Sequence, residues 1–203
     1  MESKTYPFFR GLFRGIFKGF YRWKVIGQEN IPDGEGLVLC ANHISNWDPV
    51  LLGCGIERQV HFMAKAELFR IPVISSLIKD FGTYPVKRGA GDRQAIRTSL
   101  ELAKQGKVLG IFPEGKRNRT SQGNVGNIQP GAAMIALKSG VRVVPVAIIG
   151  PYRLFRSVTI IYGQPIDLTA AVAGKETAER TQAAAEIIRS EIQKILDIHK
   201  PQV

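Results

Sequence analysis

The sequence predicts an α/β fold: a single domain with a mixed, mostly covered β-sheet flanked by helices, preceded by an N-terminal amphipathic helical segment. Three observations lead to this prediction. From residue 22 onward, short runs rich in β-branched residues alternate with helical patterns, as in α/β domains. A chain of 203 residues with 44% hydrophobic residues is long enough to bury one substantial core. The first 24 residues follow a separate four-residue pattern.

In residues 1–24 a basic residue recurs at every fourth position, at Arg10, Arg14, Lys18 and Arg22. A four-residue step on a helix advances about 400°, so residue types stay in separate arcs. The arc opposite the cations holds Phe9, Leu12, Phe13, Ile16, Phe17 and Phe20. Such a cationic amphipathic helix is typical of one that lies in an anionic membrane interface. The alternative is a helix that packs on its own domain with its cations in water.

The remaining elements follow in order along the chain. Strands are expected over 23–27, 37–41, 60–64, 83–86, 107–112, 141–149 and 157–166. Helices are expected over 47–52, 66–81, 92–106, 131–140 and 176–199, with Gly106 suited to the position after a helix. The alanine-rich stretch 170–186 is expected to be a loop that enters the last helix.

Composition narrows the classes of function. The net charge of +11 favours an anionic partner: nucleic acid, anionic lipid or an acidic carrier protein. No window approaches the ~18 consecutive apolar residues of a membrane span, and no secretory signal is recognisable, so a cytoplasmic location is expected. Cys40 and Cys54 lack the spacing of a metal or redox site and are expected to be buried thiols. His61 and His199 show no ligand spacing relative to His43, so no metal site is expected.

Three polar clusters follow the ends of three predicted strands. Asn42 and His43 follow 37–41, Lys87 and Arg88 follow 83–86, and the segment 113–115 follows 107–112. Because ligands in α/β sheets bind outside the carboxyl ends of strands, we expect these clusters to converge on one site.

His43 and Asp48 are candidates for a catalytic base and its orienting carboxylate. With His43 in the turn after a strand and Asp48 in the first turn of a helix capped by Ser45 or Asn46, the carboxylate reaches one imidazole nitrogen. The other nitrogen is then free to take a proton. No G-x-S-x-G motif or other protein nucleophile is evident, so the base would activate a substrate hydroxyl. The alternative is a polar loop that leaves a strand.

The other two clusters are rich in cations. Lys116, Arg117 and Arg119 lie beside Gly115, and Glu114 is the lone acid of that loop. Glycine lets backbone N–H groups approach an anion, and arginine presents a fork that matches phosphate oxygens. The sequence therefore predicts a phosphate site; the alternative is a solvated basic loop.

Four segments together resemble, in order and spacing, the blocks of the glycerolipid acyltransferases. They are Asn42-His43 with Asp48, the segment 82–88 (GTYPVKR), the segment 112–117 (FPEGKR) and the segment 144–147 (VPVA). The resemblance covers roughly residues 35–165 and is greatest to the 1-acyl-sn-glycerol-3-phosphate acyltransferases. The chain departs from the family pattern at Lys116, where threonine is common, and at Asn118, where serine is frequent.

The resemblance implies acyl transfer from acyl-CoA or acyl-carrier protein to the 2-hydroxyl of lysophosphatidic acid, giving phosphatidic acid, with no further cofactor. It makes residues 25–203 the acyltransferase domain, His43 the base and Asp48 its partner. The glycerol phosphate is assigned to Arg88, Glu114, Gly115, Lys116 and Arg117, with support from Asn42, Lys87, Arg119 and Pro145, the last as lining of an acyl or acceptor pocket.

Other readings stay open at this point. The same machinery would serve another acceptor, such as glycerol 3-phosphate or an amino-acid lyso-lipid, and a basic protein that binds lipid or nucleic acid without catalysis is a third possibility. Nucleic acid is disfavoured, because the aromatic and basic residues are segregated at the N-terminus. Membrane contact is expected to be peripheral, at the cytoplasmic face of the cell membrane.

Overall fold

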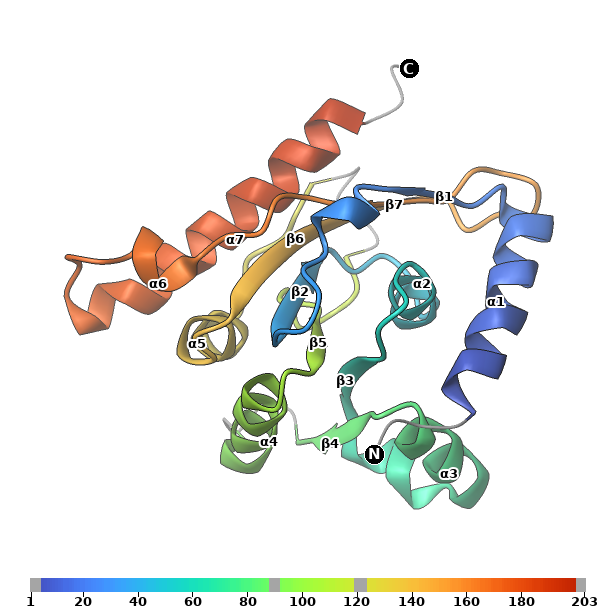
Figure 1. The fold of residues 1–203 in the computed structure, drawn as a ribbon, viewed down its shortest axis with the longest axis horizontal. Helices are drawn as coiled ribbons and strands as arrows, with labels where there is room; N and C mark the ends of the chain where they lie inside the picture. Colours follow the sequence, from blue (N-terminus) through green and yellow to red (C-terminus); the bar gives the residue numbers. More distant parts are fainter. Residues whose placement is uncertain (1–4, 88–91, 119–123, 200–203) are drawn as a thin grey trace.

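The computed structural model describes residues 5–87, 92–118 and 124–199. Figure 1 shows a central sheet with helices on both sides. The elements are α1 (Tyr6–Tyr21), β1 (Lys24–Ile26), η1 (Gln28–Asn30), β2 (Leu37–Ala41), α2 (Asp48–Cys54), β3 (Val60–Lys65), η2 (Ala66–Arg70), α3 (Pro72–Asp80), β4 (Tyr84–Val86), α4 (Arg93–Lys104), β5 (Val108–Ile111), α5 (Pro130–Lys138), β6 (Arg142–Ile149), β7 (Thr159–Tyr162), α6 (Leu168–Ala171) and α7 (Thr177–His199).

The sheet has seven strands in the order β1-β7-β6-β2-β5-β3-β4. Neighbouring strands are parallel except for β6 and β7, which are antiparallel. The strands β2 to β6 therefore run in one direction, and their carboxyl ends lie along one edge of the sheet. The chain segments that follow these ends are where α/β sheets build their sites.

Helices cover both faces of the sheet, and β2 shows how the sequence divides between them. Val38 and Cys40 point into a core with α4, α5 and α7, whereas Leu37 and Leu39 point into a second core with α1 and α2. Every residue of β2 is buried, as expected of a central strand covered on both sides. The predicted mixed, mostly covered sheet is confirmed.

Two predicted elements were wrong. The expected helix 66–81 is split into η2 and α3, because Ile71 precedes a proline and takes an extended conformation, with φ −91° and ψ 110°. The alanine-rich stretch 170–186 was expected to be a loop that enters the last helix, but its first residues belong to a further short helix, α6; the last helix itself begins at Thr177, within one residue of the predicted start. Alanine has the highest helix propensity, and Asp167 caps α6 by accepting the N–H of Ala170.

The N-terminal helix is present as α1, but its apolar residues do not form one free arc. Phe17 is 1% exposed and packs in the core with α2, and Phe9 and Phe13 also contact the domain. A second apolar row, shifted by one residue along the helix from Phe9, Phe13 and Phe17, faces solvent. Its members Phe8, Leu12 and Phe20 are exposed. The sequence pattern could not separate the two rows, because both repeat every four residues. No helix in the described part of the chain has the length and apolarity needed to cross a membrane.

The cations of α1 are divided in the same way. Arg10 and Arg14 form ion pairs with Glu57 at 2.6 and 2.7 Å, and Arg14 also donates to the carbonyl of Cys54 at the end of α2. These two arginines therefore tie α1 to the domain. Lys18 and Arg22 remain exposed to solvent.

Candidate active site

His43 and Asp48 meet at the carboxyl end of β2, as the spacing predicts. The Nδ1 atom of His43 lies 2.7 Å from Oδ2 of Asp48, and the aspartate side chain is 0% exposed while the histidine is 14% exposed. The helix that carries Asp48 begins with Trp47 as its N-cap, so the prediction of a cap at Ser45 or Asn46 was wrong. Asp48 instead accepts backbone N–H groups of the turn with its own carboxylate.

The Asp48 carboxylate is held by further donors. The backbone N–H groups of Ile44 and Ser45 donate to Oδ2 at 2.6 and 2.7 Å, and the hydroxyl of Tyr152 donates to Oδ1 at 2.7 Å. Sequence reasoning missed Tyr152, which comes from the connection between β6 and β7. The signal that would have found it is its place just after the carboxyl end of a central strand.

The imidazole of His43 is fixed by stacking. Its ring lies 4.3 Å from the ring of Phe112 with an interplanar angle of 24°, and Phe112 stacks in turn on Phe62 at 6.1 Å. Gly110 leaves the space for this stack, because a Cβ at that position would lie 2.2 Å from the Phe62 ring. Since Asp48 accepts from Nδ1–H, the tautomer leaves a lone pair on Nε2, which has no hydrogen-bond partner among the described residues.

Glu114 organises the loop after β5 rather than pointing at solvent. Its Oε1 accepts the backbone N–H of His43, and its Oε2 accepts from the Asn118 amide and the Gly126 N–H, each at 2.9 Å. The carboxylate is 4% exposed. Hydrogen-bond donors of the protein thus saturate the Glu114 carboxylate, which the sequence analysis assigned to binding of the glycerol phosphate. This corrects the expected contact: a buried carboxylate filled by three donors positions the loop and His43, and its negative charge would repel a phosphate.

The same loop closes on His43 from the other side. The backbone N–H of Asn118 donates to the carbonyl of His43 at 2.7 Å. Gly115 adopts a φ of +70°, which favours glycine, and lets the chain turn there. Lys116 and Arg117 follow on the exposed surface of this turn and pair with no described residue. Two of the three predicted clusters therefore converge, joined by hydrogen bonds.

The third cluster stands farther away. Lys87 follows β4 with an exposed side chain, and its N–H donates to Asp92 at 2.8 Å. Because β4 is three strands from β2 in the sheet, the two strand ends are about 14 Å apart at a spacing of about 4.8 Å per strand. Arg88 and Arg119 lie outside the described residues, so their predicted roles stay predictions.

Two supporting residues belong to the sheet. The Asn42 amide donates to the carbonyl of Ile148 at 3.0 Å and accepts its N–H at 2.7 Å, which joins β2 to β6 beyond the last strand pair. Pro145 is buried inside β6 in register with Cys40 and is not one of the residues that line the apolar cavity described next. Its place in a substrate pocket stays a prediction.

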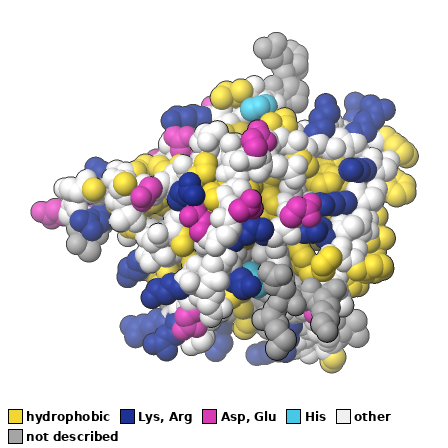
Figure 2. All heavy atoms as spheres, in the orientation of Figure 1, with side chains coloured by type: hydrophobic (Ala, Val, Ile, Leu, Met, Phe, Trp, Pro, Cys, Tyr) yellow, Lys and Arg dark blue, Asp and Glu magenta, His cyan; other side chains and the backbone are white. Residues whose placement is uncertain are grey.

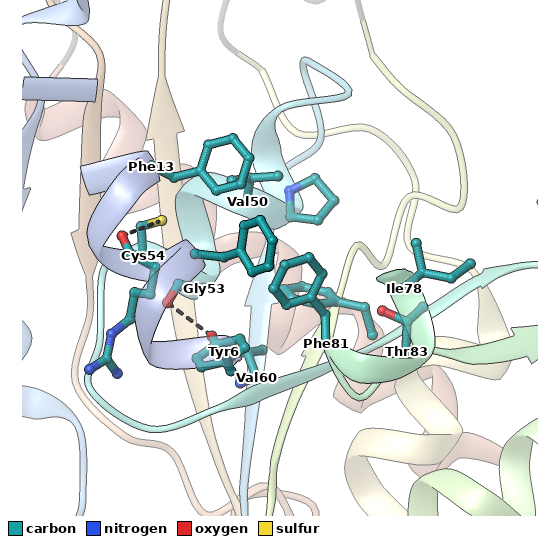
Figure 3. Close-up of a pocket in the computed structure, with 13 residues that line it drawn as sticks. Tyr6, Phe13, Val50, Gly53, Cys54, Val60, Ile78, Phe81 and Thr83 are labelled. Atoms are coloured by element: carbon teal, nitrogen blue, oxygen red, sulfur yellow. Dashed lines mark hydrogen bonds between the residues drawn. The ribbon is translucent and has the colours of Figure 1, made fainter. Parts of the chain in front are cut away.

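A cavity of about 160 Å³ opens between α1, α2, α3 and β3. Figure 3 shows the rings of Phe13 and Phe81 and the side chains of Val50 and Ile78 around it. Its walls are almost entirely apolar, and Phe62 is one of them. The cavity is therefore joined to His43 through the stacked rings of Phe62 and Phe112.

The remaining candidates are structural. Cys40 and Cys54 are free and buried as predicted, and burial raises the pKa of each thiol to about 12. The Nδ1–H of His61 donates to the carbonyl of Gly82 at 3.0 Å, and His199 lies at the exposed end of α7. Within the described ranges, no three His, Cys, Asp or Glu side chains gather as a metal site would require.

Comparison with known proteins agrees with the geometry. The Acyltransferase family model matches residues 22–149. The chain is 35% identical over 179 residues to the 1-acyl-sn-glycerol-3-phosphate acyltransferase of Bacillus subtilis, covering 85% of this chain and 87% of that protein. The protein of the same name from Streptococcus pneumoniae is 29% identical over 208 residues, 96% of this chain and 74% of its own length.

A solved structure extends the likeness to the fold. The crystal structure of the 1-acyl-sn-glycerophosphate (LPA) acyltransferase PlsC from Thermotoga maritima matches with a TM-score of 0.75 and 26% identity, over 98% of this chain and 80% of that one. The predicted family resemblance is thereby confirmed over most of the chain, together with the predicted fold class. The chain belongs to the Acyltransferase family, among the 1-acyl-sn-glycerol-3-phosphate acyltransferases.

Proposed function

We propose that this protein transfers an acyl chain from a thioester, acyl-CoA or acyl-carrier protein, to the 2-hydroxyl of lysophosphatidic acid, giving phosphatidic acid. The observation that carries the proposal is the pair of His43 and Asp48, 2.7 Å apart, with the carboxylate buried and the imidazole at the edge of solvent. The choice of lysophosphatidic acid as the acceptor follows the names of the similar proteins, which are 1-acyl-sn-glycerol-3-phosphate (LPA) acyltransferases.

In this proposal the acceptor hydroxyl gives its proton to Nε2 of His43 as its oxygen attacks the thioester carbonyl. Asp48 holds the Nδ1 proton and stabilises the imidazolium that forms. The tetrahedral intermediate collapses with cleavage of the C–S bond, and the imidazolium returns the proton to the leaving thiolate. General-base help of this kind contributes about 10²–10⁴-fold to the rate.

The phosphate of the acceptor is assigned to the cations after β5. Lys116 and Arg117 are exposed, pair with no described residue and lie on a turn that hydrogen bonds directly to the backbone of His43. An arginine fork matches phosphate oxygens, and a phosphate held there would present the neighbouring glycerol hydroxyl to the base. Arg88, the sequence's other candidate for this role, stays part of the proposal.

We assign the apolar cavity to an acyl chain. A cavity of about 160 Å³ is close to the ~150 Å³ that suffices for a benzene-sized ligand, so it holds a segment of a chain rather than a whole one. Its apolar walls meet the stacked rings beside His43, which suits a chain whose carbonyl end lies at the base.

The substrates are lipids, and the exposed apolar residues suit a peripheral position on an anionic membrane at the cytoplasmic face. The outer row of α1 (Phe8, Leu12 and Phe20) ends beside the β6–β7 connection, where the Phe155 N–H donates to the Phe20 carbonyl and Leu154 and Phe155 are 61% and 63% exposed. Exposed cations flank these residues at Lys18, Arg22, Arg153 and Arg156. Figure 2 shows hydrophobic side chains and Lys or Arg side by side along the edge of the molecule formed by α1.

The test is a product assay by mass spectrometry on the purified protein. Lysophosphatidic acid, glycerol 3-phosphate and an amino-acid lyso-lipid are offered with acyl-CoA and acyl-carrier protein donors of increasing chain length. We expect phosphatidic acid from lysophosphatidic acid, its loss in His43→Ala, and its retention in His199→Ala, a matched histidine at the exposed end of α7. Acylation of another acceptor but not of lysophosphatidic acid would refute the proposed acceptor, and no thioester consumption at all would refute catalysis.

A further inference from the structure

The Asp48 carboxylate has one donor from a distant part of the chain. Its Oδ2 receives three donors from the turn between β2 and α2, all within five residues of Asp48. Its Oδ1 receives the hydroxyl of Tyr152, 104 residues later, at 2.7 Å. This oxygen has no other donor among the described residues. A buried carboxylate is costly unless its lone pairs are satisfied, so this contact bears on how Asp48 is held.

Tyr152 is itself held firmly. Its ring packs edge-on against Tyr21 at 6.3 Å, and the connection that carries it is bonded to the end of α1 through the Phe155 N–H to Phe20 and the Val158 N–H to Tyr21. Burial and the charge of Asp48 raise the pKa of Tyr152 well above its usual range. The phenol therefore stays protonated over the working pH range and acts as a permanent donor.

We propose that Tyr152 is a positioning residue of the site: by donating to Oδ1 it keeps Oδ2 of Asp48 directed at His43 and draws part of the carboxylate charge away from the imidazole. The inference rests on the proposed role of the His43–Asp48 pair. It adds a third side chain to that pair, from a segment outside the four blocks that carry the family resemblance.

The groups near the pair settle the sign of the expected pH effect. Two titratable side chains contact Asp48: His43, from the turn after β2, and Tyr152, from the connection after β6. Tyr21 of α1 packs against the far side of the Tyr152 ring. Glu114 after β5 binds the backbone of His43 and is unchanged by a substitution at 152. Without the phenol, more of the negative charge of Asp48 faces the imidazole and favours its protonated form. A base must be neutral to accept a proton, so activity then requires a higher pH.

The test is Tyr152→Phe, which removes one hydroxyl and keeps the ring. We expect the acid limb of the kcat profile to move up by about 0.5–1 pH unit, and kcat at neutral pH to fall about 10-fold with little change in the KM of lysophosphatidic acid. Tyr21→Phe is the matched control, because the hydrogen bonds that the described residues make to His43 and Asp48 do not include the Tyr21 hydroxyl. A double variant sharpens the result: in an Asp48→Asn background, where no carboxylate charge is left to adjust, Tyr152→Phe should lower kcat by a smaller factor than it does in the parent.

An NMR titration of the imidazole nitrogens separates this inference from the proposed function, because it needs no turnover and the chain has only three histidines. The His43 midpoint should be higher in Tyr152→Phe than in the parent or in Tyr21→Phe, recorded at a temperature where circular dichroism shows each variant folded. Equal midpoints would overturn the inference even if the enzyme is active. A shifted midpoint in a protein that acylates no acceptor would instead leave Tyr152 in place and refute the proposed function.

Discussion

Replacing Asp48 with asparagine tests the candidate active site most directly. The asparagine oxygen would still accept from the His43 ring and from the two backbone N–H groups that now donate to Oδ2. Its amide would face Tyr152, whose hydroxyl has lone pairs to accept it. The hydrogen-bond geometry is therefore kept, and only the negative charge is removed.

The magnitude follows from that lost charge. When His43 takes a proton, its charge lies roughly 4 Å from that of the carboxylate, which at an effective dielectric constant of about 20 is an attraction of about 4 kcal/mol. Losing this stabilisation in the transition state corresponds to a fall in kcat of about 10³-fold. The melting temperature should change little by comparison.

The assay is steady-state release of thiol from an acyl thioester with lysophosphatidic acid as acceptor. Asp33→Asn, which makes the same chemical change at an exposed loop position, is the control and should keep full activity. If folded Asp48→Asn retained a tenth or more of the parent kcat, the charge of Asp48 would have no large catalytic role, and the reasoning from the buried pair would be refuted.

Three further predictions follow from the surface and the core. Arg117→Lys should raise the KM for the phosphorylated acceptor several-fold and leave the donor KM unchanged, because the bidentate fork is lost; steady-state kinetics with each substrate varied checks this, and equal changes in both would contradict it. Phe8→Ser should weaken binding to anionic vesicles about 10-fold in co-sedimentation, since 69% of this side chain is available for burial, whereas Ile198→Ser on the opposite face of the sheet should have no effect; equal losses would argue against α1 as the contact. Burial raises the pKa of Cys40 and Cys54 to about 12, so both thiols stay protonated up to about that pH. They should therefore not react with a chromogenic disulfide at pH 8 until denaturant is added. Rapid reaction of the folded protein would contradict their burial.

The pairs that the sequence predicted correctly are local ones. His43 and Asp48 lie five residues apart across a strand, a turn and the start of a helix, so their contact depends on a few backbone angles that the sequence pattern indicates. The predicted strands were also largely found, since apolar runs between turn residues depend on local composition.

The tertiary structure decided what the packing of distant segments controls. The order of the strands places β6 beside β2 and so brings Tyr152 to Asp48 across 104 residues, and it places β4 three strands away from the pair. It also turned Glu114 inward onto three donors, a result that a sequence reading of one acid among cations could not distinguish from a ligand contact.

The N-terminal helix shows the division most clearly. Its period of four residues determined by itself that α1 is helical, cationic and amphipathic, because those properties depend only on the order of side chains along one helix. Which of two neighbouring apolar rows is buried was decided by the surface of α2, where Phe17 is covered, and by Glu57, which binds Arg10 and Arg14. Burial is a property of two surfaces in contact, and the sequence of one helix describes only one of them.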